Sequence, residues 1–239
     1  MRAIARRLRD NSRKSIRGML LRRGLATLGR TLASGRTPGR RLLDQLVHGW
    51  GNEAWSAGAP FLSAMLDWLP RTSGPIAECG SGLTTLVLAS AASLSGRRVH
   101  SFEHDADWAA RVTRELPVRL RPCVELNVTP ITSYSEFDWY SLEAATPPHA
   151  IGFVVCDGPP GATRGGRYGL GPVLRPYLAP GCIVLLDDTQ RRDEHQIIRR
   201  WCSELEGSIV QEADTYSVLS IGHNARNRTP IADFSGARA

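Results

Sequence analysis

Short apolar runs alternate with helical patterns from Pro75 onward, and this alternation constrains the fold more than any other feature of the sequence. The apolar runs predict strands at residues 75–78, 99–103, 124–126, 152–156 and 182–186. Helical spacing predicts helices at residues 83–94, 105–116 and 190–205. Strands and helices that alternate through short connections form a parallel sheet with helices on both faces. The predicted fold class is therefore α/β, with a doubly wound sheet.

The stretch "SIVQEADTYSVLSIG" contains two β-rich runs around Ala213 and Asp214, and it predicts an antiparallel hairpin at the end of the sheet. A chain of 239 residues with 42% apolar residues can bury one sizeable core. The predicted organisation is a basic arm at 1–41, a domain at 42–222 and a loose tail at 223–239.

Nothing in the sequence predicts export or a membrane span. The longest apolar stretches suit buried strands, and the N-terminus has no apolar segment of the signal-peptide type. The five cysteines show no C-x-x-C spacing, so we interpret them as reduced residues of the core. These features favour a cytoplasmic protein, either free or peripheral to a membrane.

The arm at 1–41 carries a charge of +12, because it holds 13 of the 30 basic residues and one acid, Asp10. The other 17 basic and 22 acidic residues leave the rest of the chain at −5. Apolar residues among the arginines predict a basic amphipathic helix with little to bury, dispensable for folding: Ile4, Leu8, Ile16, Met19 and Leu20. The arm is a solvated tail, a contact with an anionic membrane, or a nucleic-acid or targeting arm, the last being least favoured.

The stretch "PIAECGSGLTTLVLASAA" places Glu78 at the end of the first predicted strand and follows it with Gly80 and Gly82. In a doubly wound sheet, ligands lie beyond the carboxyl ends of the strands, where a glycine turn lets the backbone approach closely. A dinucleotide fingerprint needs a third glycine where this chain has Thr85, and Glu78 would repel a pyrophosphate. The carboxylate suits a cationic ligand, so S-adenosylmethionine fits the pattern better than NAD.

A second acid, Glu103, ends the next predicted strand in "VHSFEHDADW", about 20 residues after the glycine turn. A carboxylate at this place can accept hydrogen bonds from the vicinal hydroxyls of a ribose. Taken alone, an acid at a helix start more often caps the helix. Together with Glu78 and the alternating strands, it supports the same ligand.

With these residues the chain resembles the class I S-adenosylmethionine-dependent methyltransferases over residues 50–221. The motifs "AECGSGLTT", "SFEHD", "FVVCDGPPG" and "IVLLDDTQR" carry the resemblance, in the order of the family. It implies a Rossmann-like seven-stranded sheet whose last strand is antiparallel. It also implies cofactor contacts after the first, second and fourth strands, from Glu78, Gly80, Ser81, Gly82, Thr84, Glu103, His104 and Asp157.

Three carboxylates end the fourth and fifth predicted strands, namely Asp157, Asp187 and Asp188. Like charges this close are costly unless a cation or a proton joins them, so the pattern predicts Mg²⁺ or another divalent ion. The chain resembles metal-dependent O-methyltransferases here, and removal of the ion by a chelator is expected to abolish transfer. In the alternative interpretation Asp157 only begins a turn, and the other two acids cap a helix or pair with Arg191 or Arg192.

Two further features complete the predicted site. His195 lies one to two turns into the helix after Asp188, where it is a second candidate for the general base beside Asp157. The glycine-rich segment "ATRGGRYGLGP" predicts a mobile loop whose Arg164, Arg167 and Tyr168 contact the substrate, unless they are simply solvated.

The predicted function is O-methylation of a hydroxyl on a small molecule or glycan by an S-adenosylmethionine-dependent enzyme. In the metal-dependent version of this hypothesis, a divalent ion assists the transfer. The alternatives are an RNA methyltransferase that uses the basic arm and a non-catalytic protein that only binds the cofactor.

Overall fold

A computed structural model describes residues 2–52 and 55–222. The predicted tail at 223–239 lies outside the described residues. The chain divides into two compact units. The helical unit comprises Met1–Arg71, Gly82–Val99 and Ala110–Glu125, and the sheet unit comprises Thr72–Ser81, His100–Ala109 and Leu126–Ala239.

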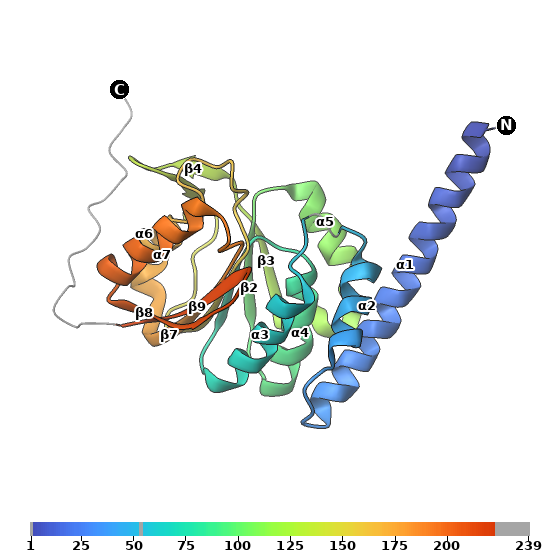
Figure 1. Ribbon diagram of the computed structural model, residues 1–239, viewed down its shortest axis with the longest axis horizontal. Helices are drawn as coiled ribbons and strands as arrows, with labels where there is room; N and C mark the ends of the chain where they lie inside the picture. Colours follow the sequence, from blue (N-terminus) through green and yellow to red (C-terminus); the bar gives the residue numbers. More distant parts are fainter. Residues whose placement is uncertain (1, 53–54, 223–239) are drawn as a thin grey trace. The chain divides into compact units, whose positions relative to one another are not determined.

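The helical unit is built from helices that precede and follow the first strand (Figure 1). They are α1 (Arg2–Ala33), α2 (Arg40–Trp50), α3 (Ala59–Trp68), η1 (Leu69–Arg71), α4 (Leu83–Ser95), the second part of α5 (Ala106–Glu115) and η2 (Val118–Cys123). Among the helices in the described ranges, none is long and apolar enough to cross a bilayer.

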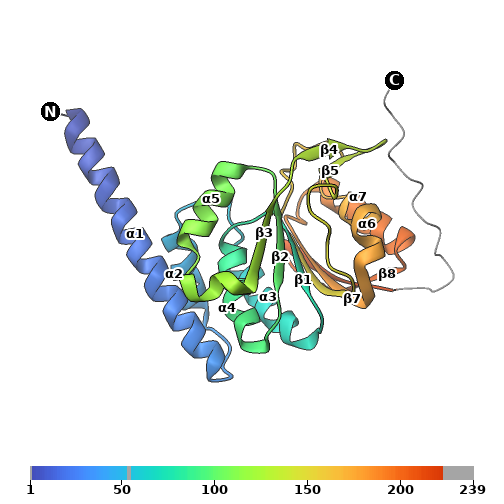
Figure 2. The same ribbon diagram turned by 180° about the vertical axis from the view of Figure 1, so that it is seen from behind.

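Helix α1 packs along α2 and α4 and is part of the core of the helical unit. Leu21, Leu25 and Leu28 are fully buried, at the spacing that places them on one face of a helix. Gly49 of α2 lies so close to α1 that a Cβ on it would come 2.7 Å from the backbone nitrogen of Leu21. The expectation that the arm has little to bury is therefore wrong for its second half. The first half of α1 extends beyond α2 in both Figure 1 and Figure 2.

The sheet has seven strands in the order β3-β2-β1-β6-β7-β9-β8. Its strands are β1 (Ile76–Cys79), β2 (Val99–Glu103), β3 (Val124–Val128), β6 (Ile151–Cys156), β7 (Leu178–Asp187), β8 (Gly207–Glu212) and β9 (Tyr216–Ile221). The pairs β1–β6 and β6–β7 are parallel, whereas β9 is antiparallel to both β7 and β8. The predicted α/β class, the Rossmann-like seven-stranded sheet and the terminal antiparallel hairpin are confirmed.

The sheet unit also contains α6 (Leu170–Leu174), η3 (Arg175–Tyr177), α7 (Arg192–Glu204) and a small hairpin of β4 (Ile131–Ser133) and β5 (Asp138–Tyr140). Side chains of β6, β7 and β9 form one apolar core with those of α6, α7 and β5. Strands β1 and β6 are buried along their whole length. Burial on both faces agrees with the apolar run of β6, whereas β1 also buries the charged residue Glu78. The parallel order brings the carboxyl ends of β1, β2, β6 and β7 to the same edge.

The burial of α1 predicts that its leucines stabilise the fold. We expect Leu28→Ala to lower the free energy of unfolding by about 2–5 kcal/mol, because it removes buried methyl groups and leaves a cavity. Urea unfolding followed by circular dichroism measures the loss. The control is Arg22→Ala on the exposed side of the same helix, which should change stability by less than about 0.5 kcal/mol. Equal stability of the two variants would show that α1 does not pack in solution.

Candidate functional site

The turn after β1 lies against the turn after β6 because both turns contain a glycine. Gly80 has a φ of +86°, which residues with a side chain rarely adopt, and a Cβ on it would lie 2.8 Å from the backbone nitrogen of Gly158. The N–H groups of Asp157 and Gly158 donate to the carbonyl of Cys79 at 3.0 and 2.7 Å. The position that a side chain of residue 80 would take is therefore filled by the backbone of the turn after β6, so this position accepts only glycine.

The buried carboxylate of Glu103 joins the segments that follow β1 and β2. Its Oε2 accepts hydrogen bonds from the N–H (3.0 Å) and the hydroxyl (2.8 Å) of Ser81. Its Oε1 accepts from the N–H groups of His104 (2.7 Å) and Asp105 (3.0 Å), and His104 Nδ1 lies 3.0 Å away. Trp108 Nε1 donates to the Ser81 carbonyl at 2.7 Å. The structure thus brings together three of the predicted cofactor residues, Ser81, Glu103 and His104.

The other predicted cofactor residues flank this turn. Glu78 is fully buried in β1, and its Oε2 accepts a hydrogen bond of 2.6 Å from the Ser101 hydroxyl. Gly82 precedes α4 and donates its N–H to Thr85 Oγ1 at 2.9 Å. A Cβ on Gly82 would meet no atom within 4 Å, and Thr84 is buried in the first turn of α4. Gly82, unlike Gly80, therefore faces open space.

A buried arginine binds the ends of β6 and β7. Arg167 is 2% exposed, and its Nη2 donates to the carbonyl of Asp157 (2.7 Å), to Asp157 Oδ1 (3.1 Å) and to Asp188 Oδ2 (2.7 Å). Its Nη1 donates to the Asp187 carbonyl at 2.6 Å. Glu194 Oε1, on α7, lies 3.9 Å from Arg167 Nε. Because a guanidinium is planar and rigid, these bonds fix the two strand ends relative to one another.

Asp188 connects β7 to α7 in a strained backbone conformation. Its φ is +61°, in the left-handed region, and a non-glycine residue held there costs about 1–3 kcal/mol. Its Oδ2 accepts from Arg167 and lies 2.9 Å from Arg191 Nη1. These two cations hold the carboxylate, and they offset the cost of the backbone.

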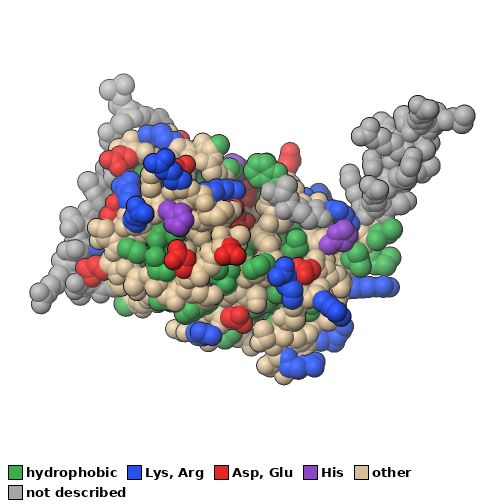
Figure 3. Space-filling model, viewed as in Figure 1, with side chains coloured by type: hydrophobic (Ala, Val, Ile, Leu, Met, Phe, Trp, Pro, Cys, Tyr) green, Lys and Arg blue, Asp and Glu red, His purple; other side chains and the backbone are tan. Residues whose placement is uncertain are grey.

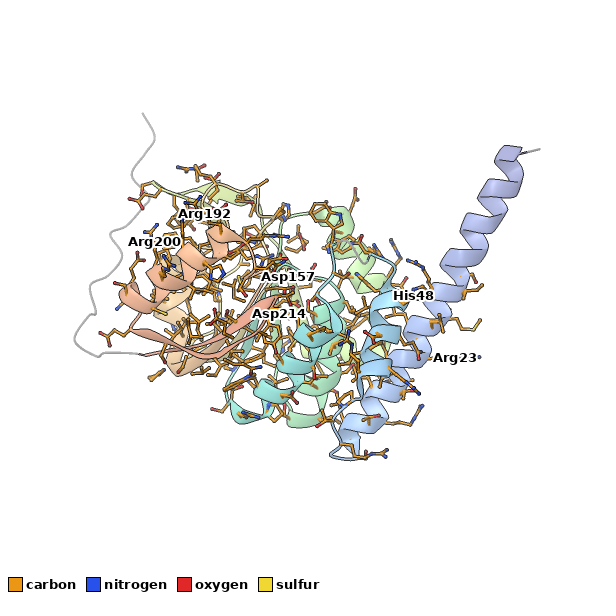
Figure 4. The ribbon with its side chains drawn as sticks, in the orientation of Figure 1. Arg23, His48, Asp157, Arg192, Arg200 and Asp214 are labelled. Atoms are coloured by element: carbon orange, nitrogen blue, oxygen red, sulfur yellow. The ribbon has the colours of Figure 1, made fainter. Side chains whose placement is uncertain are left out.

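Burial alters the protonation of the carboxylates around Arg167. It raises the pKa of Asp157 well above the ordinary range, and the charge of Asp187 raises it further, against the opposing effect of Arg167. Burial also raises the pKa of Asp187, to about 6, and the pKa of Glu194. The Asp157 side chain is still 21% exposed. Asp157 therefore combines a raised pKa with access from outside, at the sheet edge seen in Figure 4.

The arrangement does not fit the predicted divalent ion. Asp157 and Asp188 converge as expected, but the cation between them is the guanidinium of Arg167. Asp187 uses Oδ1 to accept the N–H of Asp188. Within residues 2–52 and 55–222, no three His, Cys, Asp or Glu side chains form a group that could hold a metal ion. Two of the three carboxylates that suggested a metal are paired with an arginine instead.

The three predicted substrate contacts are engaged within the chain. Arg167 is the buried cation just described. Arg164 Nη2 donates to Asp138 Oδ1 at 2.8 Å, and the Tyr168 hydroxyl donates to Glu204 Oε2 at 2.6 Å. The predicted general base His195 lies on the exposed side of α7. The structure therefore brings neither His195 nor the side chains of Arg164 and Tyr168 to the carboxylates at the strand ends.

Sequence reasoning missed Glu194, the residue of α7 that faces Arg167. It shares an inward row with Ile197, Ile198 and Trp201, which are buried at helical spacing. That periodicity is the signal that identifies Glu194 rather than His195 as the buried polar residue of the helix. Neither Glu194 Oε2 nor Arg167 Nε has a hydrogen-bond partner among the described residues.

Tyr140 was also missed, and it lies behind the glycine turns. Its hydroxyl is buried without a hydrogen-bond partner in the described part of the chain. A Cβ on Gly158 would come 2.7 Å from that hydroxyl. Burial, with the charge of Glu103 as a smaller cause, raises the pKa of Tyr140 well above its ordinary value, so the phenol stays neutral. No motif in the sequence distinguishes this tyrosine from an ordinary core residue.

Comparisons with known proteins agree with this geometry. Residues 77–189 match the family model described as a methyltransferase domain. The O-methyltransferase from Bacillus cereus, solved in complex with SAH, has a TM-score of 0.52 at 15% identity, over 83% of this chain and 90% of that one. The precorrin-6y C5,15-methyltransferase from Geobacter metallireducens has a TM-score of 0.52 at 11% identity, over 71% of this chain and 91% of that one. No sequence among curated proteins matches significantly. At these identities the two structures show a common fold.

The raised pKa of Asp187 predicts a specific dependence of stability on pH. The folded state holds the Asp187 proton up to about pH 6, whereas an unfolded chain releases it near about pH 4, so stability falls as pH rises between these values. Asp187→Asn keeps an oxygen that can accept the Asp188 N–H but removes the charge, and it should reduce this fall. Urea unfolding from pH 4 to 7 measures it, with Asp214→Asn at an exposed position as the control. If the stability of Asp187→Asn falls with pH as steeply as that of the unmodified chain, burial of the Asp187 carboxyl does not cause the pH dependence.

Proposed function

We propose, from the match of residues 77–189 to a methyltransferase-domain family model, that the chain is a class I S-adenosylmethionine-dependent methyltransferase and that it methylates a hydroxyl group of a small molecule or glycan. The observation that supports this acceptor class is the carboxylate of Asp157, which is fixed by Arg167 at the end of β6 and is partly exposed. A neutral hydroxyl must lose its proton during transfer, and a positioned carboxylate with a raised pKa is suited to accept it.

We assign the cofactor to the turn after β1 and to Glu103. When bound, S-adenosylmethionine supplies a methyl group on a positively charged sulfur. Two of the donors to Glu103 belong to side chains that can rotate, the Ser81 hydroxyl and the His104 imidazole, whereas the backbone N–H groups stay in place. Rotation of these side chains frees lone pairs of Glu103 for ribose hydroxyls. The open space at Gly82 suits close approach of a ligand to the backbone.

The residues around Arg167 would divide the work of proton transfer. Asp157 accepts the proton of the acceptor hydroxyl, since its side chain reaches the surface of the site. Arg167 holds Asp157 and Asp188 in place and supplies the positive charge that the metal hypothesis assigned to a divalent ion. In this proposal the transfer needs no metal. Burial raises the pKa of Asp157, so this side chain gains and loses its proton at higher pH than an ordinary carboxyl.

The cofactor assignment predicts that Gly82→Ala weakens the binding of S-adenosylmethionine by tenfold or more without destabilising the chain. The added methyl group meets no protein atom, so only a ligand that approaches the backbone there can clash with it. Calorimetric titration with the cofactor measures the change. Gly39→Ala is the matched control, because a Cβ on Gly39 also meets no atom and its φ of −72° accepts alanine. Gly80 is unsuitable, since any side chain there clashes with Gly158. Equal affinity in both alanine variants would contradict the assignment.

The proton-acceptor assignment predicts that transfer survives an excess of chelator and that Asp157→Asn lowers turnover about 100-fold. Asparagine keeps an oxygen for the Arg167 bond but cannot accept the proton. Activity is measured with labelled cofactor and a panel of hydroxylated metabolites, glycans and RNA. The parallel variant His195→Ala tests the other candidate base, and a loss of activity there would move the proton acceptor to α7. Transfer that stops in chelator and returns with Mg²⁺ would restore the metal mechanism, and transfer to RNA alone would replace the acceptor class.

A further inference from the structure

One face of α1 combines exposed apolar and basic side chains. Residues spaced by three and four positions lie in one row along a helix, and on α1 one such row consists of Ile16, Met19, Arg23, Ala26, Arg30 and Ala33. Ile16 and Met19 are 57% and 44% exposed. Arg23 and Arg30 are exposed as well, and Figure 4 shows Arg23 pointing away from the helix. This row is distinct from the buried leucines by which α1 packs on α2.

The same row opens into a cavity within the helical unit. The cavity has a volume of about 350 Å³ and is lined by α1, α4 and η2. Arg30 and Arg119 contribute guanidinium groups, and Ser90 and Ser93 contribute hydroxyls. Arg119 Nη2 would lie 3.6 Å from a Cβ on Gly29, so this arginine lies against α1. No described carboxylate lines the cavity, so its two arginines give it a positive electrostatic potential.

Exposed apolar side chains border the cavity. Leu94, at its edge on α4, is 52% exposed, and Val118, next to Arg119 on η2, is 74% exposed. With Ile16 and Met19 they make up four of the eight large hydrophobic side chains that are exposed in the described residues. Figure 3 shows hydrophobic and basic side chains side by side where the described part of α1 begins. Large aliphatic side chains that gather beside arginines mark an interaction surface.

We propose that this face of the helical unit, formed by the α1 row with Leu94, Val118 and Arg119, docks on a membrane that contains anionic phospholipids. The aliphatic side chains would enter the acyl boundary, and the arginines of the cavity would bind a head-group phosphate. A nucleic acid would match the arginines but would leave the aliphatic side chains in water, so a lipid surface fits the whole face better. The sequence of residues 1–14 continues the same mixture of apolar and basic residues.

Vesicle co-sedimentation of the full chain tests this surface. Binding is compared on phosphatidylcholine vesicles with and without phosphatidylglycerol, at low and high salt. We expect binding only where the anionic lipid is present, and weaker binding in salt. The double variant Arg30→Gln and Arg119→Gln should weaken it about 25-fold, at about fivefold for each arginine near the surface. The double variant Ile16→Ser and Met19→Ser should weaken it about tenfold, because less apolar area is buried.

The charge-matched control replaces two exposed arginines of α7, in Arg192→Gln and Arg199→Gln, and it should bind vesicles like the unmodified chain. All variants should unfold at the same temperature as the unmodified chain and bind S-adenosylmethionine with the same affinity. The reason is that they alter exposed side chains outside the proposed cofactor site. The proposal is overturned if the control pair weakens binding as much as the cavity pair, or if the unmodified chain does not sediment with anionic vesicles. It is also overturned if the surface variants bind RNA more weakly than the unmodified chain while their binding to vesicles is unchanged.

Discussion

The candidate site depends on one buried cation. Arg167 gives up nearly all contact with water, and a charge in that position is stable only where oxygen atoms replace the lost solvent. It finds them at the ends of two neighbouring strands, in the carbonyls of Asp157 and Asp187 and in the carboxylates of Asp157 and Asp188. The same bonds that stabilise the guanidinium hold the edge of the sheet where a proton acceptor is needed. Stability and site geometry therefore have a common origin here.

The carboxylates around this arginine are not equivalent. Asp188 is bound by two arginines, whereas Asp187 and Glu194 are buried with less compensation and have raised pKa values. Asp157 lies between these cases, since it is bound to Arg167 and is also reached from outside. Two arginines, Arg167 and Arg191, beside four acids leave the group with more negative than positive charge. Protons make up part of that difference, and a site of this kind holds and releases them readily.

The sequence was sufficient for those features that depend on local pattern. Apolar runs and glycine turns located the strands, and the acids that follow them converge because parallel strands end at one edge. The sequence was insufficient where no local motif identifies the partner of a charged group. Three acids together demand a cation, but nothing local distinguishes a metal ion from Arg167, which is ten residues beyond Asp157 in a glycine-rich segment. Likewise, the high net charge of residues 1–41 concealed the row of Leu21, Leu25 and Leu28. A net charge summed over the whole arm does not show that one face of its helix is apolar.

The contact between Gly80 and Gly158 limits how chains with this site can diverge. Two turns that meet backbone to backbone cannot take up a side chain on either side, and an inserted residue in one would displace the other. A second glycine contact joins the segment from Gly161 to Gly166 to the hairpin of β4 and β5, because a Cβ on Gly165 would come 2.6 Å from Cβ of Phe137. Arg164 also ties the two segments together through Asp138. A change of acceptor specificity among relatives is therefore expected to arise by exchange of these paired segments, as one unit, while the contact between Gly80 and Gly158 stays as it is.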